Sequence, residues 1–563
     1  MFATSLAMFV SVPAARADGL SYTLTKVGGF GGEPSATSDS QGTLYVSSFG
    51  SSYRSDDKGV SWTSLAHRDG SGDDCIFTDQ SGAVYWCNLG GADTAPLQAD
   101  VWKSVDKGTT WRKSTSSVSG DSSTCGQSCS PFGVDRDWGA ASILNPATQT
   151  TKDAEVVIMY HDFWGPSSIW VNISRDGGAT FGPMQNVLAS PATTPGAVSG
   201  SLVAEGYTFC NTTPSGVAIV PPGEPHAGRI YVGWIAADPP EDAAGCNLTQ
   251  AEAYHTIWVS YSDDNGSTWT AQQAYDAGVG HDTSGIFAEM TLDNQGNPYF
   301  AFVAPPRGMN PGVCAAESAQ GGDTLQADKS CGYDMNVVWS SDGGNTWDGG
   351  GGTVPGSAAA PYTVNGPSET GTHWFPAIAA AAPGQVDVAY LRTATIEPSD
   401  PAGKVLPGAC AGPSSGRPNF PPACSWDMYV AKSVNLTLPP SGSNAATWTT
   451  SDLTAPSAMH VGDICNLGIA CVGNLGSNRS LSDFIMEAID PTTGCAHVAY
   501  ADNGPTSPHK GQLVAANETA GCFAAPAVTP ETPAPALLLV IGLPVAVAVA
   551  LRRRRRDSGG FAA

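Results

Sequence analysis

An eight-residue block with the pattern S-x-D-x-G-x-[ST]-[WF] occurs five times in this chain, and no other sequence feature constrains the fold as strongly. In such a block, the Asp side chain can accept hydrogen bonds from its own turn, the Gly can adopt a backbone angle that a Cβ atom would forbid, and the hydroxyl groups of Ser and Thr can cap the turn. The terminal aromatic side chain then packs under the turn. The block therefore predicts a β-hairpin turn, and its recurrence predicts a repeat architecture. The five copies are residues 55–62, 104–111, 174–181, 262–269 and 340–347.

The block resembles the Asp-box, or BNR repeat, of the sialidase-like β-propellers, and the resemblance extends over residues 35–448. In that family the box lies between the third and fourth strands of a blade, on its outer edge and away from the active face. The resemblance therefore implies a propeller fold. It marks the turns of the blades and does not by itself mark a catalytic residue.

Short runs of strand-like residues surround each block, whereas long amphipathic helical patterns are absent. A sixth unit ends in a degenerate block at Thr447 and Trp448, and a seventh, at residues 484–516, lacks a fourth strand. Residues 21–27 could supply that strand, which would close the ring and leave no exposed sheet edge. We therefore expect an all-β propeller of seven four-stranded blades over residues 18–522, with the N-terminal strand closing the last blade. The six blades of the sialidases are the alternative.

The chain is strongly acidic, with 51 Asp and Glu against 26 Lys and Arg and a formal net charge of −25. Binding to nucleic acid is not expected, because phosphate contacts need a basic surface. High acidity is more simply explained by solubility in a salty or extracellular medium.

The two ends of the chain carry the signals of an exported, surface-attached protein. Residues 1–17 form an apolar stretch that ends in the A-x-A cleavage pattern of a signal peptide. Residues 523–535 form a Pro/Thr-rich spacer, residues 536–551 an apolar anchor that is short for a membrane-spanning helix, and residues 552–563 a basic cytoplasmic tail. This arrangement also resembles prokaryotic C-terminal sorting signals, in which the tail is cut and replaced by a covalent anchor. Both interpretations predict attachment at the cell surface.

Fourteen cysteines in an exported chain predict disulfides. Cys75 and Cys87 flank a tight turn, and their spacing would place them opposite each other on paired strands. Pairing of sequence neighbours is a hypothesis for the rest, because sequence alone does not fix connectivity. A zinc site at Cys125 and Cys129 is an alternative, although no second Cys/His pair lies near it. The proposed pairs are Cys75 with Cys87, Cys125 with Cys129, Cys210 with Cys246, Cys314 with Cys331, Cys410 with Cys424, Cys465 with Cys471, and Cys495 with Cys522.

Several charged residues are expected in the loops that enter the first strands of the blades, on the face with the long, disulfide-linked loops. Sialidases bind the substrate carboxylate with three arginines, since a guanidinium group matches a carboxylate with two parallel hydrogen bonds. The resemblance therefore implies Arg68, Arg136 and Arg479 as carboxylate-binding candidates and Asp135 and Asp137 as acid/base candidates. The family's F/Y-R-I-P motif is absent from this sequence. The structural alternative is that Arg136 pairs with its flanking aspartates to fix the loop.

Other polar and aromatic residues of the same loops are candidates for ligand binding. Their side chains could stack on sugar rings or form hydrogen bonds with them, while packing between blades is the structural alternative for the aromatic ones. Asp73 and Asp74 are candidate ligands for a structural Ca²⁺ ion, and no other cofactor is required. The remaining candidates are Trp138, Trp164, His281, His373, Trp374 and Asp483.

The sequence therefore favours an exported, surface-anchored and monomeric propeller that recognises an extracellular glycan or glycoprotein. An exo-α-sialidase or related glycoside hydrolase is the first alternative, and an adhesive or structural protein of the cell envelope is the second. The fold is compatible with all three, because a fold does not determine a function.

Overall fold

The computed structural model describes residues 19–29, 31–68, 70–90, 98–115, 133–145, 150–162, 169–188, 212–236, 254, 256–277, 288–304, 333–347, 361–366, 369, 371–394, 425–439, 445–462, 464 and 480–524. They all belong to one compact unit that ends at Ala524, and the unit after it, residues 525–563, lies outside the described ranges. The expected signal peptide, spacer, anchor and tail therefore remain predictions, apart from the first two residues of the spacer, which the structure includes. Within the described ranges, no helix is long and apolar enough to cross a membrane.

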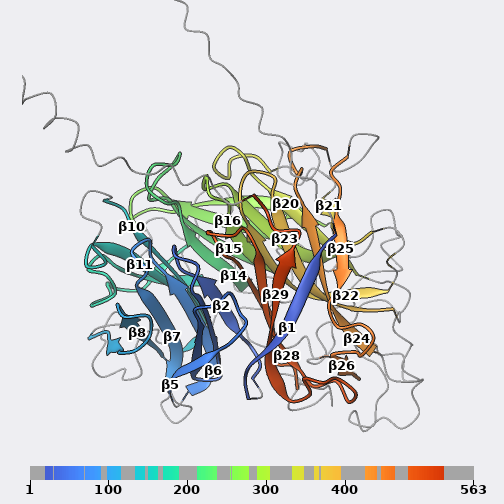
Figure 1. Ribbon diagram of the computed structural model, residues 1–563. Helices are drawn as coiled ribbons and strands as arrows, with labels where there is room; N and C mark the ends of the chain where they lie inside the picture. The colour runs from blue at the N-terminus through green and yellow to red at the C-terminus, as the bar shows by residue number, and fades with distance from the viewer. Residues whose placement is uncertain are drawn as a thin grey trace, which may run out of the picture. The chain divides into compact units, whose positions relative to one another are not determined.

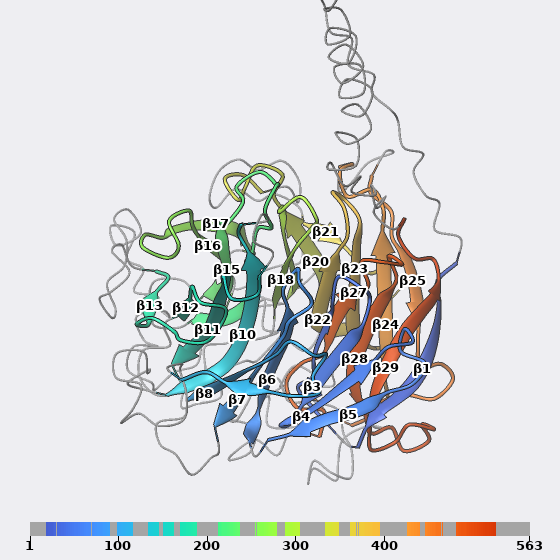
Figure 2. The ribbon, with the colours of Figure 1, turned by 60° about the vertical axis from the view of Figure 1, so that its left-hand side comes forward.

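The described residues form seven antiparallel sheets, and this confirms the all-β propeller with seven blades (Figures 1 and 2). Blade 1 contains β2 (Ser35–Ser38), β3 (Leu44–Ser48), β4 (Ser51–Ser55) and β5 (Thr63–His67). Blade 2 contains β6 (Gly70–Thr78), β7 (Val84–Gly90), β8 (Ala99–Ser104) and β9 (Arg112–Lys113). Blade 3 contains β10 (Val134–Ile143), β11 (Ala154–Asp162), β12 (Ile169–Ser174) and β13 (Gln185–Asn186). Blade 4 contains β14 (Thr212–Ile219), β15 (Ile230–Ala236), β16 (Thr256–Ser262) and β17 (Thr270–Asp276).

The last three blades follow the same plan. Blade 5 contains β18 (Glu289–Leu292), β19 (Pro298–Ala304), β20 (Asp334–Trp339) and β21 (Tyr362–Thr363). Blade 6 contains β22 (Thr372–Ala380), β23 (Val386–Thr393), β24 (Ser425–Ser433) and β25 (Thr449–Asp452), and a short strand, β26 (His460–Val461), also pairs with β24. Blade 7 contains β27 (Met486–Ile489), β28 (Ala496–Asp502), β29 (Gln512–Ala520) and the N-terminal β1 (Ser21–Gly28).

The blades close into a ring through their innermost strands. Each innermost strand contacts that of the next blade, and β27 of blade 7 contacts β2 of blade 1. The fourth strand of blade 7 is β1, which runs antiparallel to β29 with Leu24 opposite Ala516 (Figure 1). The predicted closure by the N-terminal strand is therefore confirmed. Large apolar side chains pack between neighbouring blades, as when Tyr85 of blade 2 joins a buried cluster with Val156 of blade 3.

The eight-residue blocks connect the third and fourth strands of blades 1 to 5, as expected, and all five use the same hydrogen bonds. In the first copy, Asp57 Oδ1 accepts from the backbone N–H of Ser61 at 2.8 Å, and Asp57 Oδ2 accepts from the Ser61 hydroxyl at 2.6 Å. The backbone N–H of Gly59 donates to Ser55 Oγ at 2.8 Å. In the degenerate block of blade 6, Asn435 takes the place of the Asp and accepts from the backbone N–H of Thr447 at 3.0 Å.

A second recurring turn, with the pattern D-x-x-G-x-x-Y, joins the first and second strands of blades 1, 2 and 5, and the sequence analysis missed it. The Asp accepts hydrogen bonds from the backbone and from the Tyr hydroxyl of the second strand. In blade 2, Asp79 Oδ2 accepts from the Tyr85 hydroxyl at 3.0 Å, and in blade 5, Asp293 Oδ2 accepts from Tyr299 at 3.1 Å. These turns begin at Asp39, Asp79 and Asp293.

The expectation that the candidate site residues lie in loops is wrong for three blades. Gly70 to Asp74, Asp135 to Trp138 and His373 to Phe375 lie within the innermost strands β6, β10 and β22, which begin earlier than predicted. The reason is a β-bulge near the start of each strand, which interrupts the alternation of apolar residues on which the strand prediction depended.

Two of the seven proposed disulfides lie in the described part of the chain, and both are present. Cys75 and Cys87 are register partners on β6 and β7, with 4.9 Å between their Cα atoms. The second disulfide joins Cys495, in the turn between β27 and β28, to Cys522, which follows β29.

The other five proposed disulfides lie outside the described residues, so their pairing stays a prediction. The same holds for the alternative zinc site at the first of these pairs. The five pairs are Cys125 with Cys129, Cys210 with Cys246, Cys314 with Cys331, Cys410 with Cys424, and Cys465 with Cys471.

A buried ionic network joins blade 6 to blade 7. Lys432 of β24 lies 3.1 Å from Asp387 of β23 and 2.6 Å from Glu518 of β29, and all three side chains are fully buried. The hydroxyl group of Tyr22, on β1, donates to Asp387 at 3.3 Å. Burial, together with the charge of Asp387, raises the pKa of Glu487 well above its usual range, so this fifth member of the network holds its proton more strongly than an ordinary glutamic acid.

Candidate functional site

The site is built on the bulges near the starts of the innermost strands. At its bulge, β10 skips from Asp135 to Trp138 in its pairing with β11, and Arg136 has a left-handed backbone with φ of 52°. Phe375, at the corresponding bulge of β22, has φ of 50°. An extra residue turns its side chain out of the regular alternation of the strand. Charged side chains can therefore converge from several blades at the end of the ring where the innermost strands begin.

The Arg136 side chain is the centre of this convergence. It is 6% exposed, and its Cζ lies 4.1 Å from the ring centroid of Phe484 and 4.6 Å from that of Trp138. Burial lowers the pKa of Arg136, and neighbouring carboxylates act in the opposite direction. These carboxylates belong to blades 1, 2, 3 and 7, and they are Glu33, Asp73, Asp135 and Asp483. Of the two flanking aspartates in the structural alternative, Asp135 is one of these carboxylates, whereas Asp137 lies against the Cys75–Cys87 disulfide.

Asp73 and Asp135 differ in acidity although they are close neighbours. Burial, and then the Asp135 carboxylate, raise the pKa of Asp73 to about 6. Burial also acts to raise the pKa of Asp135, but the hydrogen bond and charge of His161 and the charge of Arg136 outweigh it and lower that pKa. His161 Nε2 lies 3.2 Å from Asp135 Oδ2, across the β10–β11 pair in which the two residues are register partners. At neutral pH, Asp135 is an anion and Asp73 can exchange a proton.

Four residues of this group are only partly buried, namely Asp73, Asp135, Trp138 and His161, and we call them the mouth surface. The Asp135 side chain is 29% exposed and that of His161 is 16% exposed. A ligand at this end of the ring can therefore reach a carboxylate, an imidazole and an indole ring, whereas Arg136 lies behind them.

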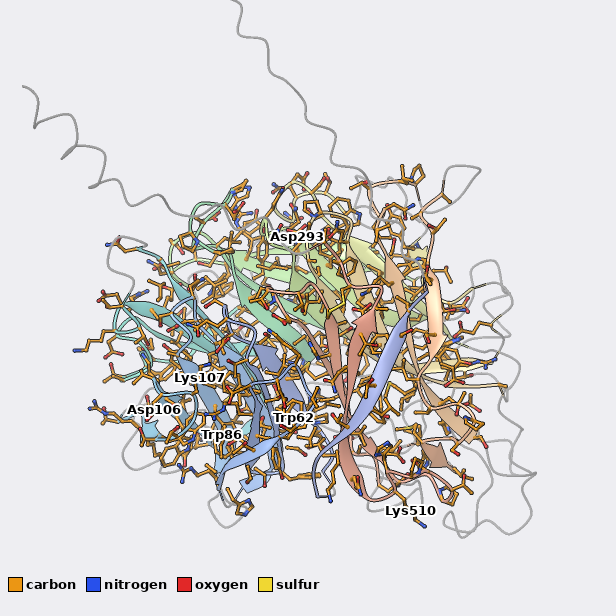
Figure 3. The ribbon with its side chains drawn as sticks, viewed as in Figure 1. Trp62, Trp86, Asp106, Lys107, Asp293 and Lys510 are labelled. Atoms are coloured by element: carbon orange, nitrogen blue, oxygen red, sulfur yellow. A yellow bond between two sulfur atoms is a disulfide. The ribbon has the colours of Figure 1, made fainter. Side chains whose placement is uncertain are left out.

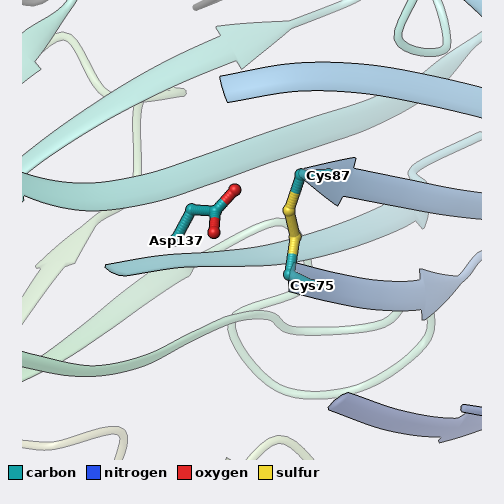
Figure 4. A group of neighbouring side chains, drawn as sticks. All are labelled: Cys75, Cys87 and Asp137. Atoms are coloured by element: carbon teal, nitrogen blue, oxygen red, sulfur yellow. A yellow bond between two sulfur atoms is a disulfide. The ribbon is translucent and has the colours of Figure 1, made fainter. Parts of the chain in front are cut away.

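Asp137 is buried against the Cys75–Cys87 disulfide rather than on the mouth surface (Figure 4). One carboxylate oxygen and both sulfur atoms lie within 4.8 Å of one another. Burial, together with the charges of Asp73 and Asp74, raises the pKa of Asp137 well above its usual range. Asp137 thus holds its proton more strongly than an ordinary aspartic acid.

The carboxylates of Asp73 and Asp74 are both engaged by protein groups. Asp73 Oδ2 accepts from the backbone N–H of Arg136 at 3.1 Å, and Asp74 Oδ2 accepts from the backbone N–H of Gly50 at 2.8 Å. Asn88 donates to the other oxygen of Asp74. Arg136 already supplies a cation to this acidic group, so the residues fit a Ca²⁺ ion poorly, and calcium binding at Asp73 and Asp74 stays a prediction.

The remaining candidate site residues fall into three groups: fully buried residues, one member of the Arg136 cluster, and residues outside the described ranges. His373 is fully buried, with Nδ1 2.6 Å from the Tyr333 carbonyl oxygen and Nε2 3.2 Å from Glu369. Trp374 is also fully buried and packs edge to face on Tyr333. Asp483 belongs to the Arg136 cluster. Trp164, His281 and Arg479 lie outside the described residues.

The structure does not bring Arg68 together with Arg136. Arg68 follows β5, and its Cζ lies 4.0 Å from the ring centroid of Trp102 on β8, the third strand of blade 2. Arg136 instead points toward Phe484, at the start of blade 7. Of the three arginines that the resemblance implies, Arg136 alone is thus found in the central cluster among the described residues.

Sequence reasoning missed His161, Glu33 and Glu289 as members of the site. His161 could have been found by pairing the predicted strands of blade 3, because it lies directly opposite Asp135. Glu33 precedes its strand and has φ of 49°, and no sequence pattern indicated its direction. Glu289 begins β18, and its pKa is influenced by the Arg136 charge.

A pH-dependent change in stability is expected from Glu289. Burial raises the pKa of this carboxyl group to about 8, against an ordinary value of 4.5. The folded state therefore holds a proton that the unfolded state releases, so the free energy of unfolding should fall between pH 4.5 and about pH 8, at up to roughly 1.4 kcal/mol per pH unit. In Glu289→Gln this contribution should vanish. Urea titrations at pH 5 and pH 7 should show a loss of about 1–3 kcal/mol in the wild type that the variant does not show. Equal losses in both proteins would contradict the assignment.

No family model matches the sequence, and no curated protein matches it. Among solved structures, an ulvan lyase described as a new family of polysaccharide lyase has 12% identity and a TM-score of 0.42, covering 89% of this chain and 96% of its own. A Penicillium chrysogenum α-L-arabinanase has 12% identity and a TM-score of 0.34, and the match covers 77% of this chain and 99% of the arabinanase. A Xanthomonas campestris xyloglucanase has 13% identity and a TM-score of 0.36, and the match covers 91% of this chain and 70% of the xyloglucanase. Similarity at this level leaves the ligand of the chain to be inferred from its own residues.

Proposed function

We propose that this propeller is an exported, surface-anchored protein that binds a glycan at the mouth surface. The observation that carries the proposal is that the bulge of β10 lies between two partly exposed residues, Trp138 and an ionised Asp135 that His161 contacts at 3.2 Å. The C–H faces of a sugar ring pack on an indole ring, while its hydroxyl groups donate to a carboxylate. Asp73, with a pKa of about 6, can accept or donate in the same contact.

The charge of the site favours a neutral sugar. An acidic sugar would need a cation at the site, and Arg136 is the cation of the cluster. Arg136 is, however, only 6% exposed, and four carboxylates surround it. A carboxylate on the ligand would add like charge to this group and be repelled. We therefore expect uncharged glycans to bind better at the mouth surface than sialylated ones.

Binding should depend on Trp138 and Asp135. The protein for this test comprises residues 18–529, and a glycan array first identifies the neutral glycan that binds best. Calorimetry with that glycan should then show that Trp138→Ala and Asp135→Asn each weaken binding about tenfold or more. The matched control is Trp62→Ala, which removes another half-buried tryptophan, at the block of blade 1 (Figure 3). Binding that survives Trp138→Ala, or that falls equally in Trp62→Ala, would contradict the proposal.

A second candidate function is glycoside hydrolysis, favoured by the different acidities of Asp73 and Asp135. Two neighbouring acids whose pKa values are pushed apart can supply a proton donor and a proton acceptor. Hydrolysis of neutral aryl glycosides that is lost in both Asp73→Asn and Asp135→Asn would support this function. Turnover of a fluorogenic sialoside that is lost in Arg136→Lys would support the sialidase alternative instead. If neither glycan binding nor turnover is detected, the adhesive or structural protein of the cell envelope is the alternative that remains.

A further inference from the structure

A pocket lies between blades 2 and 3, at the ends of the strands opposite the mouth surface, and we call it the side pocket. Its volume is about 310 Å³, which is within the range of small-ligand sites. Parts of β8, β9, the β10–β11 turn and the second and third eight-residue blocks form its walls. The residues that line it are Lys103, Val105, Thr110, Trp111, Arg112, Lys113, Thr151, Lys152, Asp176, Gly177, Gly178 and Ala179.

The charge of the side pocket is opposite to that of the protein. Four cations line it against the single carboxylate of Asp176, in a chain whose net charge is −25. Asp176 is occupied within its own block, where it accepts from the backbone and hydroxyl of Thr180 at 2.8 and 2.6 Å. Arg112 and Lys152 are exposed, and within the described ranges neither forms an ion pair. Their charges are therefore available to a ligand.

Hydrogen bonds between the two blades hold the pocket in shape. Lys103 Nζ donates to the carbonyl oxygens of Thr151 at 2.6 Å and Gly177 at 2.8 Å, which fixes both the turn that carries Lys152 and the block opposite it. On the other wall, the backbone N–H of Thr115 donates to the Ala179 carbonyl oxygen at 3.0 Å. Gly177 has φ of 69°, and a Cβ atom there would collide with the Thr151 carbonyl oxygen. A preformed cavity costs a ligand little ordering free energy.

We propose that the side pocket binds the anionic group of an acidic polysaccharide, with Arg112 and Lys152 as the ligand-binding cations and Lys103 as a positioning residue. Guanidinium and ammonium groups both donate to carboxylate or sulfate oxygens, and Arg112 can do so with two parallel bonds. Since the mouth surface is acidic and the side pocket is basic, the two sites would select different sugars. The proposal does not depend on the function of the mouth surface.

The test uses oligogalacturonide as the acidic probe and its methyl ester as the neutral one, with residues 18–529 of the chain and calorimetry as the measurement. The acidic probe should bind, the neutral ester should bind at least about tenfold more weakly, and added salt should weaken the acidic complex. The variant Arg112→Glu/Lys152→Glu should weaken binding about tenfold or more. The control Lys26→Glu/Lys510→Glu makes the same change of charge at exposed lysines of blade 7 and should bind as the wild type does (Lys510 in Figure 3).

Three outcomes would overturn the proposal. They are no binding of the acidic probe to the wild type, equal losses in the two double variants, and equal affinity for a polyglutamate peptide and for the sugar. Trp138→Ala should leave binding of the acidic probe unchanged, and a loss there would place that probe on the mouth surface instead. Far-ultraviolet circular dichroism of each variant shows whether it is folded.

Discussion

Replacing Arg136 with methionine should lower the free energy of unfolding by about 3–5 kcal/mol at pH 7, because it removes a buried cation from a group of carboxylates that includes the buried Glu33 and Asp483. Four carboxylates from blades 1, 2, 3 and 7 act on this guanidinium group, which is 6% exposed. Methionine preserves the apolar contacts of the side chain, so the loss measures charge rather than volume. Urea denaturation followed by tryptophan fluorescence gives the value.

Arg68→Met is the matched control for Arg136→Met. Arg68 stacks on the half-buried Trp102, and a cation–π contact of that kind is worth roughly 0.5–1 kcal/mol. The two arginines were equal candidates from the sequence, so the contrast between their variants tests the different places that the structure gives them. A loss below about 1 kcal/mol in Arg136→Met would show that the carboxylates do not need their cation.

The Arg136 variant should recover at acid pH. Protonation of the surrounding carboxylates removes the repulsion that the substitution exposes, so the difference from the wild type should shrink as the pH falls through the pKa of Asp73, which is about 6. A difference that stays constant between pH 7 and pH 5 would indicate lost packing instead.

Replacing Lys432 with methionine should have an effect of similar size at another place in the ring. Its ammonium group lies 2.6 Å from Glu518 and 3.1 Å from Asp387, and all three side chains have no exposed area. Removing one partner of a buried ion pair costs about 3–5 kcal/mol, because the other partner is left charged and without compensation. Since Glu518 belongs to β29 and Asp387 to β23, the variant should weaken the contact between blades 6 and 7.

Comparing the single variant Lys432→Met with the double variant Lys432→Met/Glu518→Gln separates the effect of charge on stability from the effect of packing. If uncompensated charge is the cause, the second substitution should restore part of the lost stability, and a double-mutant cycle gives the coupling between the two residues. Lys510→Met, at an exposed lysine, should change stability by less than about 0.5 kcal/mol. Equal losses in Lys432→Met and Lys510→Met would contradict the role of the network.

The ring could be predicted from the sequence because its signals are local. Each eight-residue block fixes its own turn through its own Asp, Ser and Gly, so counting the blocks and the strand-like runs beside them gave seven blades. The partner of residues 21–27 could be named because one blade lacked a strand. The pairing of Cys75 with Cys87 followed from the short turn between them, and the structure confirms it.

The site was less predictable because it depends on departures from regular strand geometry. Arg136 enters the central cluster through a bulge with positive φ, and no residue pattern in the chain indicates that bulge. Asp135 and Asp137 looked equivalent in the sequence, yet one faces His161 and the other a disulfide. Such differences depend on which blades meet at the centre of the ring, so they can be recognised only from the three-dimensional arrangement.

The pairing of β1 with β29 has a consequence for how the chain can be rewired. Ser21 lies opposite Ala520, so the contact that completes blade 7 joins positions at opposite ends of the described chain. A circular permutant that links residue 524 to residue 19 through a few glycines, and opens the chain at the exposed turn near Gly223, would turn this remote pairing into a hairpin between sequence neighbours. Contacts between sequence neighbours form faster than remote ones, so the β1–β29 pairing should form earlier in folding of the permutant, whereas β14 and β15, which pair across the new opening, should become the late pairing that closes the same ring.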